Sequence, residues 1–168
     1  MTDDQNLKKT FNVTYEVSGR SVGKMRNEIR GRQTEPSIEP EFEMATDEAG
    51  FHDGEGSAPL PLAYFCTGLV ACLMTQIRAF SKRMRIETGD VNVNAVIKWT
   101  ATMEGRNPYK SLPKEFLLDI DLDSSASLDD QKRLIEASKE GCFIEATLAN
   151  PIPVHHRLKD EDSYLPID

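Results

Sequence analysis

The chain has 168 residues, of which 39% are hydrophobic and 29% are charged. This ordinary balance excludes the charge-rich, aromatic-poor composition of disordered chains and predicts one folded domain, since domains usually run to ~100–150 residues. The formal net charge of −8 argues against nucleic acid and anionic membrane surfaces as partners.

Neither a leader nor a membrane span is predicted. Residues 1–10 form a polar N-terminal segment without the charged and then apolar regions of a signal peptide, so we expect a cytoplasmic protein. The apolar run 60–74 is broken by Thr67 and Gly68 and soon meets Arg78, so it falls short of the ~18–20 residues of a membrane helix. An odd count of 3 cysteines fits reduced thiols in a reducing compartment.

The N-terminal part is predicted to be an antiparallel meander. Apolar and polar residues alternate over 11–17, and further strands are expected over 23–32 and 38–44. The stretch 18–21 (SGRS) is expected to turn the first strand. Residues 47–57, dense in glycine and acids, are expected to form a loop.

A long helix is predicted over residues 62–84. Residues that favour a helix start precede it: Ser57, Pro59 and Pro61. Residues 62–74 carry no charge and place apolar side chains in every direction, which predicts a helix enclosed by the rest of the fold.

The second half is predicted to contain a hairpin, two helices and a final strand. The hairpin strands are expected over 91–100 and 116–122, and Ser127 is expected to cap a helix that ends at Gly141. The remaining elements are a short helix over 143–148 and a strand over 152–158. This order favours an α+β fold with one domain over residues 11–158 and a C-terminal tail over 159–168.

The cysteines are the residues most able to carry chemistry. Cys66 and Cys72 lie six residues apart on the predicted helix, ~9 Å along its axis and about 120° around it, so they cannot bond to each other. Any intramolecular disulfide would therefore use Cys142. Cys66 lies among bulky apolar residues and is expected to be buried and inert.

Two motifs resemble the OsmC/Ohr family of organic hydroperoxide reductases. Residues 56–62 (GSAPLPL) begin the long helix and place Cys72 eleven residues after Pro61. Residues 140–148 (EGCFIEATL) resemble the family's glycine-cysteine helix start, with a leucine six residues after the cysteine. The predicted order of strands and helices also agrees over residues 11–158.

The resemblance implies antiparallel sheets around a long central helix and a thiol-dependent peroxidase. Cys72 would attack an organic hydroperoxide as a thiolate and become a sulfenic acid, and Cys142 would condense with it to a disulfide. An external dithiol would then reduce the disulfide. The resemblance also implies an intertwined homodimer, and the chemistry requires no metal or other cofactor.

The motifs depart from the family pattern at two positions and leave one role open. Leu62 replaces the family's usual acid and Phe143 its usual proline. An arginine would stabilise the thiolate and the leaving alkoxide, and the resemblance allows either Arg20 or Arg30. The apolar residues expected to favour an organic peroxide are Leu60, Leu62 and Phe65.

Three other functions are weighed against the peroxidase. A long apolar helix wrapped by a sheet could bind a fatty acyl or similar hydrophobic ligand, or the same disulfide could serve a redox sensor with negligible turnover. A metal site is not expected, because the adjacent His155 and His156 would point to opposite faces of a strand and His52 lacks ligand spacing.

Overall fold

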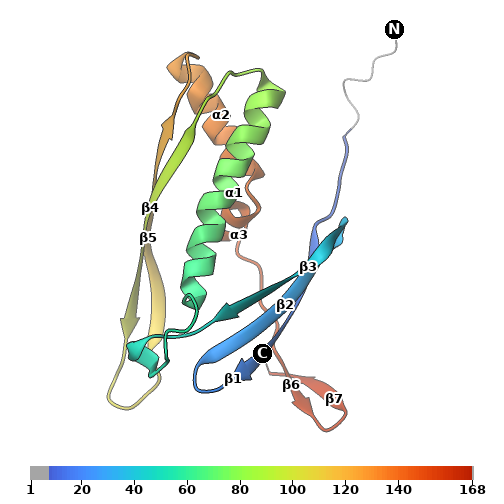
Figure 1. The fold of residues 1–168 in the computed structure, drawn as a ribbon, viewed down its shortest axis with the longest axis vertical. Coiled ribbons are helices and arrows are strands. Elements are labelled where there is room, and N and C mark those ends of the chain that lie inside the picture. Colours follow the sequence, from blue (N-terminus) through green and yellow to red (C-terminus); the bar gives the residue numbers. More distant parts are fainter. Residues whose placement is uncertain (1–7, 168) are drawn as a thin grey trace. The chain divides into compact units, whose positions relative to one another are not determined.

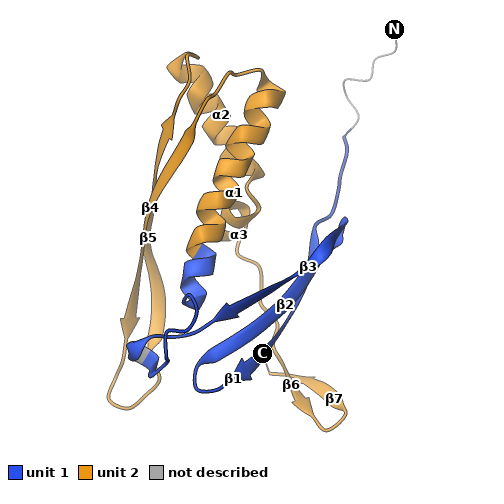
Figure 2. Cartoon of the chain, viewed as in Figure 1, with its two compact units in different colours: residues 1–65 blue, residues 66–168 orange. Residues whose placement is uncertain are grey.

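A computed structural model describes residues 8–167, so most of the polar segment 1–10 lies outside the described residues. The described chain has an α+β architecture of antiparallel sheets and α-helices (Figure 1), which confirms the predicted fold class. It divides into two compact units, residues 1–65 and residues 66–168 (Figure 2). The boundary falls inside the long helix and not at a linker, and the single domain over residues 11–158 stays a prediction.

Unit 1 contains a three-stranded antiparallel sheet in the order β1-β2-β3. Its strands are β1 (Thr14–Val22), β2 (Arg26–Glu35) and β3 (Ser37–Thr46). The turn predicted at residues 18–21 is wrong, because β1 continues through them and turns at Gly23, whose φ of +67° suits glycine. Gly19 instead lets a neighbour approach: a Cβ there would lie 2.9 Å from Ile29 Cδ1.

The strand register separates two faces of this sheet. Arg20 pairs with Glu28 across β1 and β2, and Glu28 pairs with Ala45 across β2 and β3. The next row of directly opposed residues on the three strands contains Ser18, Arg30 and Glu43. Since directly opposed side chains share a face, these charges lie together on one side of the sheet.

Unit 2 is built on most of the helix α1 (Pro61–Met84), which the sequence predicted within a residue. The antiparallel hairpin of β4 (Val91–Thr102) and β5 (Lys110–Leu122) follows it. Its buried core joins α1, β4 and the next helix through four residues: Leu73, Ile77, Val91 and Leu134. Half-buried side chains of both hairpin strands pack against this cluster, so the hairpin covers one side of α1 (Figure 1).

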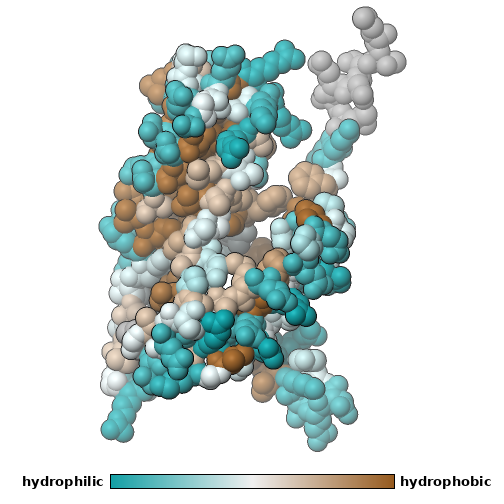
Figure 3. All heavy atoms as spheres, in the orientation of Figure 1, coloured by the Kyte–Doolittle hydropathy of each residue, from teal (hydrophilic) through white to brown (hydrophobic). Residues whose placement is uncertain are grey.

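Within the chain, α1 is less enclosed than its composition predicts. Only one stripe of the helix is buried: Leu69, Leu73, Ile77 and Ser81. Apolar side chains lie at the surface over α1 and the hairpin (Figure 3), and Leu62 is 54% exposed. The apolar residues cover more of the helix circumference than the hairpin and the following helices bury, so the predicted enclosure is wrong for this chain alone.

By length and composition α1 could also cross a membrane. Its most apolar 18-residue window has a mean hydropathy of 1.3, and 17% of that window is buried. The prediction that the apolar run falls short of a membrane helix is therefore wrong by length and composition, because Thr67 and Gly68 interrupt the run without making α1 polar. The core helix of a soluble protein passes the same criterion.

The C-terminal half of unit 2 contains two helices and a small hairpin. Helix α2 (Leu128–Gly141) starts as predicted, since Ser127 Oγ accepts a hydrogen bond of 3.2 Å from the Asp130 N–H. Helix α3 (Phe143–Ala149) follows at once, and β6 (Arg157–Asp160) pairs with β7 (Ser163–Pro166). The strand predicted over 152–158 is therefore misplaced, and most of the predicted tail 159–168 is hairpin.

Candidate active site

Cys72 lies where α1 packs against the corner between α2 and α3. One turn before it, Gly68 faces Ile144, whose Cδ1 would lie 3.2 Å from a Cβ at residue 68. Two turns after it, Phe80 faces Gly141, where a Cβ would lie 2.5 Å from two ring carbons. The absence of side chains at both glycines lets the corner approach α1 on either side of Cys72.

Cys142 occupies that corner and contacts Cys72. It is both the C-cap of α2 and the N-cap of α3, and its side chain is fully buried. Burial raises the pKa of the Cys142 thiol to about 11, and a side-chain hydrogen bond with Cys72 also raises it. The backbone N–H groups of Glu145 and Ile144 lower the pKa and offset part of this effect.

The two thiols of this pair differ in burial: Cys142 is fully buried, whereas Cys72 is half-buried. Both thiols are free. The half-buried Cys72 is the more accessible of the two thiols, and the raised pKa of Cys142 keeps that thiol protonated at neutral pH.

Cys66 lies on another face of α1, as its spacing predicts. It is half-buried and lines an apolar groove of about 520 Å³ between α1 and β4. The other walls of this groove include Val70, Met74, Ala95 and Ile97. The structure thus brings two of the three cysteines together and leaves Cys66 apart from them.

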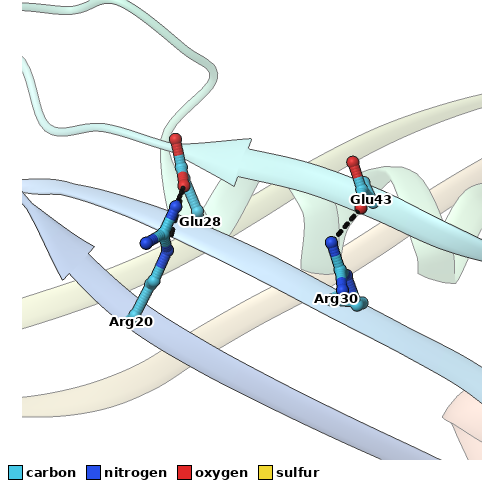
Figure 4. Close-up of polar contacts among 4 residues, drawn as sticks. All are labelled: Arg20, Glu28, Arg30 and Glu43. Carbon is cyan, nitrogen blue, oxygen red and sulfur yellow. Dashed lines mark hydrogen bonds and ion pairs between the residues drawn. The ribbon is translucent and has the colours of Figure 1, made fainter.

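Arg20 and Arg30 both lie on the charged face of the sheet in unit 1, each beside a glutamate (Figure 4). Arg20 donates from Nε and from Nη2 to Glu28 Oε2, at 3.1 and 2.5 Å. Arg30 donates from Nη2 to Glu43 Oε1 at 2.5 Å. A groove of about 800 Å³ is lined in part by these four residues.

A buried carboxylate holds the segment that leads into α1. Asp47 Oδ2 accepts hydrogen bonds from the backbone N–H and the Oγ of Ser57, at 2.9 and 2.8 Å. Arg26 Nη1 donates to the same Oγ at 2.9 Å. These bonds, above all those from Ser57, hold the pKa of Asp47 below its usual range, although Oδ1 is buried without a hydrogen-bond partner. Sequence reasoning missed this residue, since nothing in a polar loop marks one acid as buried.

Burial also perturbs a second carboxylate. Glu145 lies in the first turn of α3, three residues after Cys142. Burial raises the pKa of its carboxyl, while the positive charge of Lys139 partly offsets the increase. Its Oε1 is buried without a hydrogen-bond partner.

The residues predicted to select an organic peroxide lie at the start of α1. Leu60 and Leu62 are about half exposed, at 46% and 54%, and Phe65 is half-buried. Their role stays a prediction. Among residues 8–167, no group of three or more His, Cys, Asp or Glu side chains is placed to hold a metal ion.

Comparison with known proteins assigns the family. The model of the OsmC-like protein family matches residues 54–157. An OsmC-like hydroperoxide resistance protein from Jannaschia sp. CCS1 is 42% identical, with a TM-score of 0.63 over 92% of this chain and 97% of that one. The chain belongs to the OsmC-like protein family.

More distant members of the OsmC-like family share the fold. An organic hydroperoxide resistance protein OsmC from Legionella pneumophila is 19% identical, with a TM-score of 0.51 over 84% of this chain and 91% of that one. An OsmC-like protein of unknown function from Vibrio cholerae is 12% identical, with a TM-score of 0.55 over 82% of this chain and 94% of that one. Curated protein sequences gave no match.

The family match confirms the resemblance that the two motifs indicated. The matched span contains Cys72, Cys142 and the leucine that replaces the family's acid, Leu62. It does not contain Arg20 or Arg30. The choice between the two arginines must therefore rest on their structural setting.

Proposed function

We propose that this protein is a thiol-dependent peroxidase that reduces organic hydroperoxides, with Cys72 as the attacking thiol and Cys142 as its disulfide partner. The hydrogen-bonded pair of free thiols in unit 2 is the observation that carries the proposal. The 42% identity with an OsmC-like hydroperoxide resistance protein supports the same reaction. The protein would work in a reducing, cytoplasmic compartment, where an external dithiol is available.

Two steps at Cys72 and Cys142 together would reduce the hydroperoxide by two electrons. The Cys72 thiolate attacks the terminal peroxide oxygen, the O–O bond breaks, and the leaving alkoxide takes up a proton to become an alcohol. Cys142 then attacks the Cys72 sulfenic acid, which releases water and forms the disulfide. An external dithiol reduces the disulfide and is itself oxidised.

The arginine and the apolar residues would act on the first step. The guanidinium of Arg20 or Arg30 would stabilise the thiolate and the developing charge on the alkoxide. Leu60, Leu62 and Phe65 would favour an organic group over the bare hydroxyl of hydrogen peroxide.

Thiol counting and intact mass test this function directly. Reduced protein treated with cumene hydroperoxide should lose two of its 3 thiols, and its mass should fall by about 2 Da as the disulfide forms. Cys142→Ser should accumulate a sulfenic acid at Cys72, and Cys66→Ser should behave like the wild type. If all thiols remain unreacted, the protein is not a peroxidase.

Steady-state turnover separates the enzyme from a redox sensor. The enzyme should consume peroxide continuously with a dithiol such as dithiothreitol. A sensor would form the same disulfide but turn over negligibly.

A second candidate function rests on the apolar groove between α1 and β4. Its volume of about 520 Å³ and its apolar lining would suit a fatty acyl chain. A fluorescent fatty acid should then bind to reduced wild type and to Cys72→Ser with equal affinity. Failure to bind at micromolar concentrations would exclude this function.

We also propose a homodimer, which would cover apolar surface that the chain leaves exposed. Large apolar side chains are exposed in both units: Tyr15, Val17, Ile38, Ile152, Val154 and Leu158. A second copy would cover such residues and the open side of α1 without a membrane. Sedimentation should give a dimer in detergent-free buffer, whereas a monomer or flotation with lipid vesicles would contradict the proposal.

A further inference from the structure

A cluster of basic side chains lies at the end of α1 in unit 2, away from the cysteine pair in sequence and in role. Its members are all exposed: Arg78, Lys82, Arg83 and Arg85. None of them forms an ion pair or a side-chain hydrogen bond with another residue in the range 8–167. Residues 56–86 contain no Asp or Glu, so the neighbouring sequence supplies no carboxylate to neutralise them.

Three of these cations line one pocket of about 430 Å³, which we call the basic pocket. It lies between the end of α1 and the loop that leads to β4. Arg78 and Lys82 are four residues apart on one face of the helix, and Arg85 follows three residues later. The lining also includes the carboxylate of Glu87, so cations outnumber acids in it.

The loop side of the basic pocket is held by hydrogen bonds to the segment that follows β5. The Ser124 hydroxyl donates to the Glu87 carbonyl at 2.6 Å, and the Gly89 N–H donates to the Asp123 carbonyl at 2.7 Å. Because these bonds order the loop already, a ligand that binds there has less conformational freedom to remove.

Arg85 occupies a backbone position that favours glycine. It is the first residue after α1, and its φ is +56°. The Ile86 N–H donates to the Ser81 carbonyl at 2.9 Å, and the Arg85 N–H donates to the Lys82 carbonyl at 3.4 Å. These two bonds form a Schellman cap, which needs only backbone atoms of residue 85. Glycine would adopt this conformation at a lower steric cost, so the cap does not explain the arginine side chain.

The negative end of the helix macrodipole explains only part of the basic cluster. Its effect is limited to the last turn of a helix, which contains Lys82 and Arg83. Arg78 lies more than one turn before Met84, the last residue of α1. The pocket cation furthest from the helix end therefore needs another explanation.

We propose that the basic pocket binds the phosphate group of a small, soluble, phosphate-bearing molecule. The guanidinium groups of Arg78 and Arg85 can each donate paired hydrogen bonds to phosphate oxygens, and Lys82 adds a third positive charge. The volume leaves room for a small organic group beside the phosphate. The net charge of −8 disfavours anionic membranes and nucleic acids, whose charge extends beyond the pocket.

Isothermal titration calorimetry with phenyl phosphate tests the proposal. The wild type should bind one phenyl phosphate per chain, inorganic phosphate should displace it, and added salt should weaken the binding. Arg78→Gln and Arg85→Gln should each weaken it at least about tenfold, because each removes charge-assisted hydrogen bonds. Arg83→Gln is the matched control: it removes the same charge from the cluster but not from the lining, so the affinity should stay nearly unchanged.

Two further variants separate ligand binding from folding. Arg85→Gly removes the cation and suits the left-handed backbone, so it should be at least as stable as the wild type in urea while losing phenyl phosphate binding. Glu87→Gln removes the carboxylate that repels the anion, so it should bind phenyl phosphate more tightly than the wild type.

Three results would overturn the proposal. The first is no binding of phenyl phosphate or inorganic phosphate to the wild type at millimolar concentrations. The second is an equal loss of affinity in Arg83→Gln and Arg85→Gln, which would indicate a diffuse effect of charge. The third is binding to vesicles that contain phosphatidic acid without binding of phenyl phosphate, which would assign the cluster to a lipid surface.

Discussion

Replacing Gly141 by alanine tests how closely the α2–α3 corner must approach α1. Gly141 has a regular helical backbone, so glycine is required there for space and not for conformation. A Cβ would lie 2.5 Å from Cε2 and Cζ of Phe80, whereas ordinary contacts begin near 3.4 Å. The corner or the ring must move by nearly 1 Å, and such overpacking typically costs about 1–3 kcal/mol.

Gly68→Ala is the matched control on the other side of Cys72. Its Cβ would lie 3.2 Å from the flexible end of Ile144, and alanine in a helix gains up to about 1 kcal/mol over glycine. Gly68→Ala should therefore match or exceed the wild type in stability, while Gly141→Ala should fall below it in urea denaturation.

The same pair of variants has a kinetic readout. Moving the corner displaces Cys142 from Cys72, so Gly141→Ala should form the disulfide at least about tenfold more slowly after a pulse of peroxide. The first oxidation of Cys72 should be little affected. Wild-type stability and disulfide kinetics in Gly141→Ala, or equal losses in Gly68→Ala, would refute the reasoning.

Three further predictions follow from burial and charge. Because burial raises the pKa of Cys142 to about 11, the rate of disulfide formation should keep rising above pH 9 in stopped-flow measurements; a plateau at lower pH would contradict this. Leu134→Ala should lower the free energy of unfolding by about 2–5 kcal/mol in urea, because Leu134 is fully buried in the core. Leu128→Ala, at a 65% exposed position, should change it by no more than about 0.5 kcal/mol. The hydrogen bonds from Ser57 lower the pKa of Asp47, so their stabilisation is present above about pH 4 and lost as pH falls. The stability difference between wild type and Asp47→Asn should shrink on acidification, and a pH-independent difference would exclude this role.

Local sequence pattern was sufficient to predict much of the fold. The uncharged run after Pro61 predicted α1, and Ser127 marked the start of α2, because capping and helical periodicity depend on residues a few positions apart. The cysteine motifs indicated the family, which the match over residues 54–157 confirms. The pairing of Cys72 with Cys142 also came from this resemblance and not from spacing alone.

Short-range sequence pattern gave a wrong prediction where a residue is needed for a contact with a segment distant in the sequence. Gly19 resembles a turn residue, but its missing side chain makes room for Ile29 on the next strand. The sequence likewise could not tell which side of α1 is covered, because that depends on the packing of the hairpin and the two later helices.

The sequence by itself determined the helices, most of the strands and the family, since these depend on local periodicity and on family motifs. The tertiary structure alone decided that the pKa of Cys142 is raised, because this depends on the burial of its side chain and on a hydrogen bond to a residue 70 positions away. It also decided that Glu28 is the partner of Arg20, since strand register brings together side chains that sequence leaves eight residues apart.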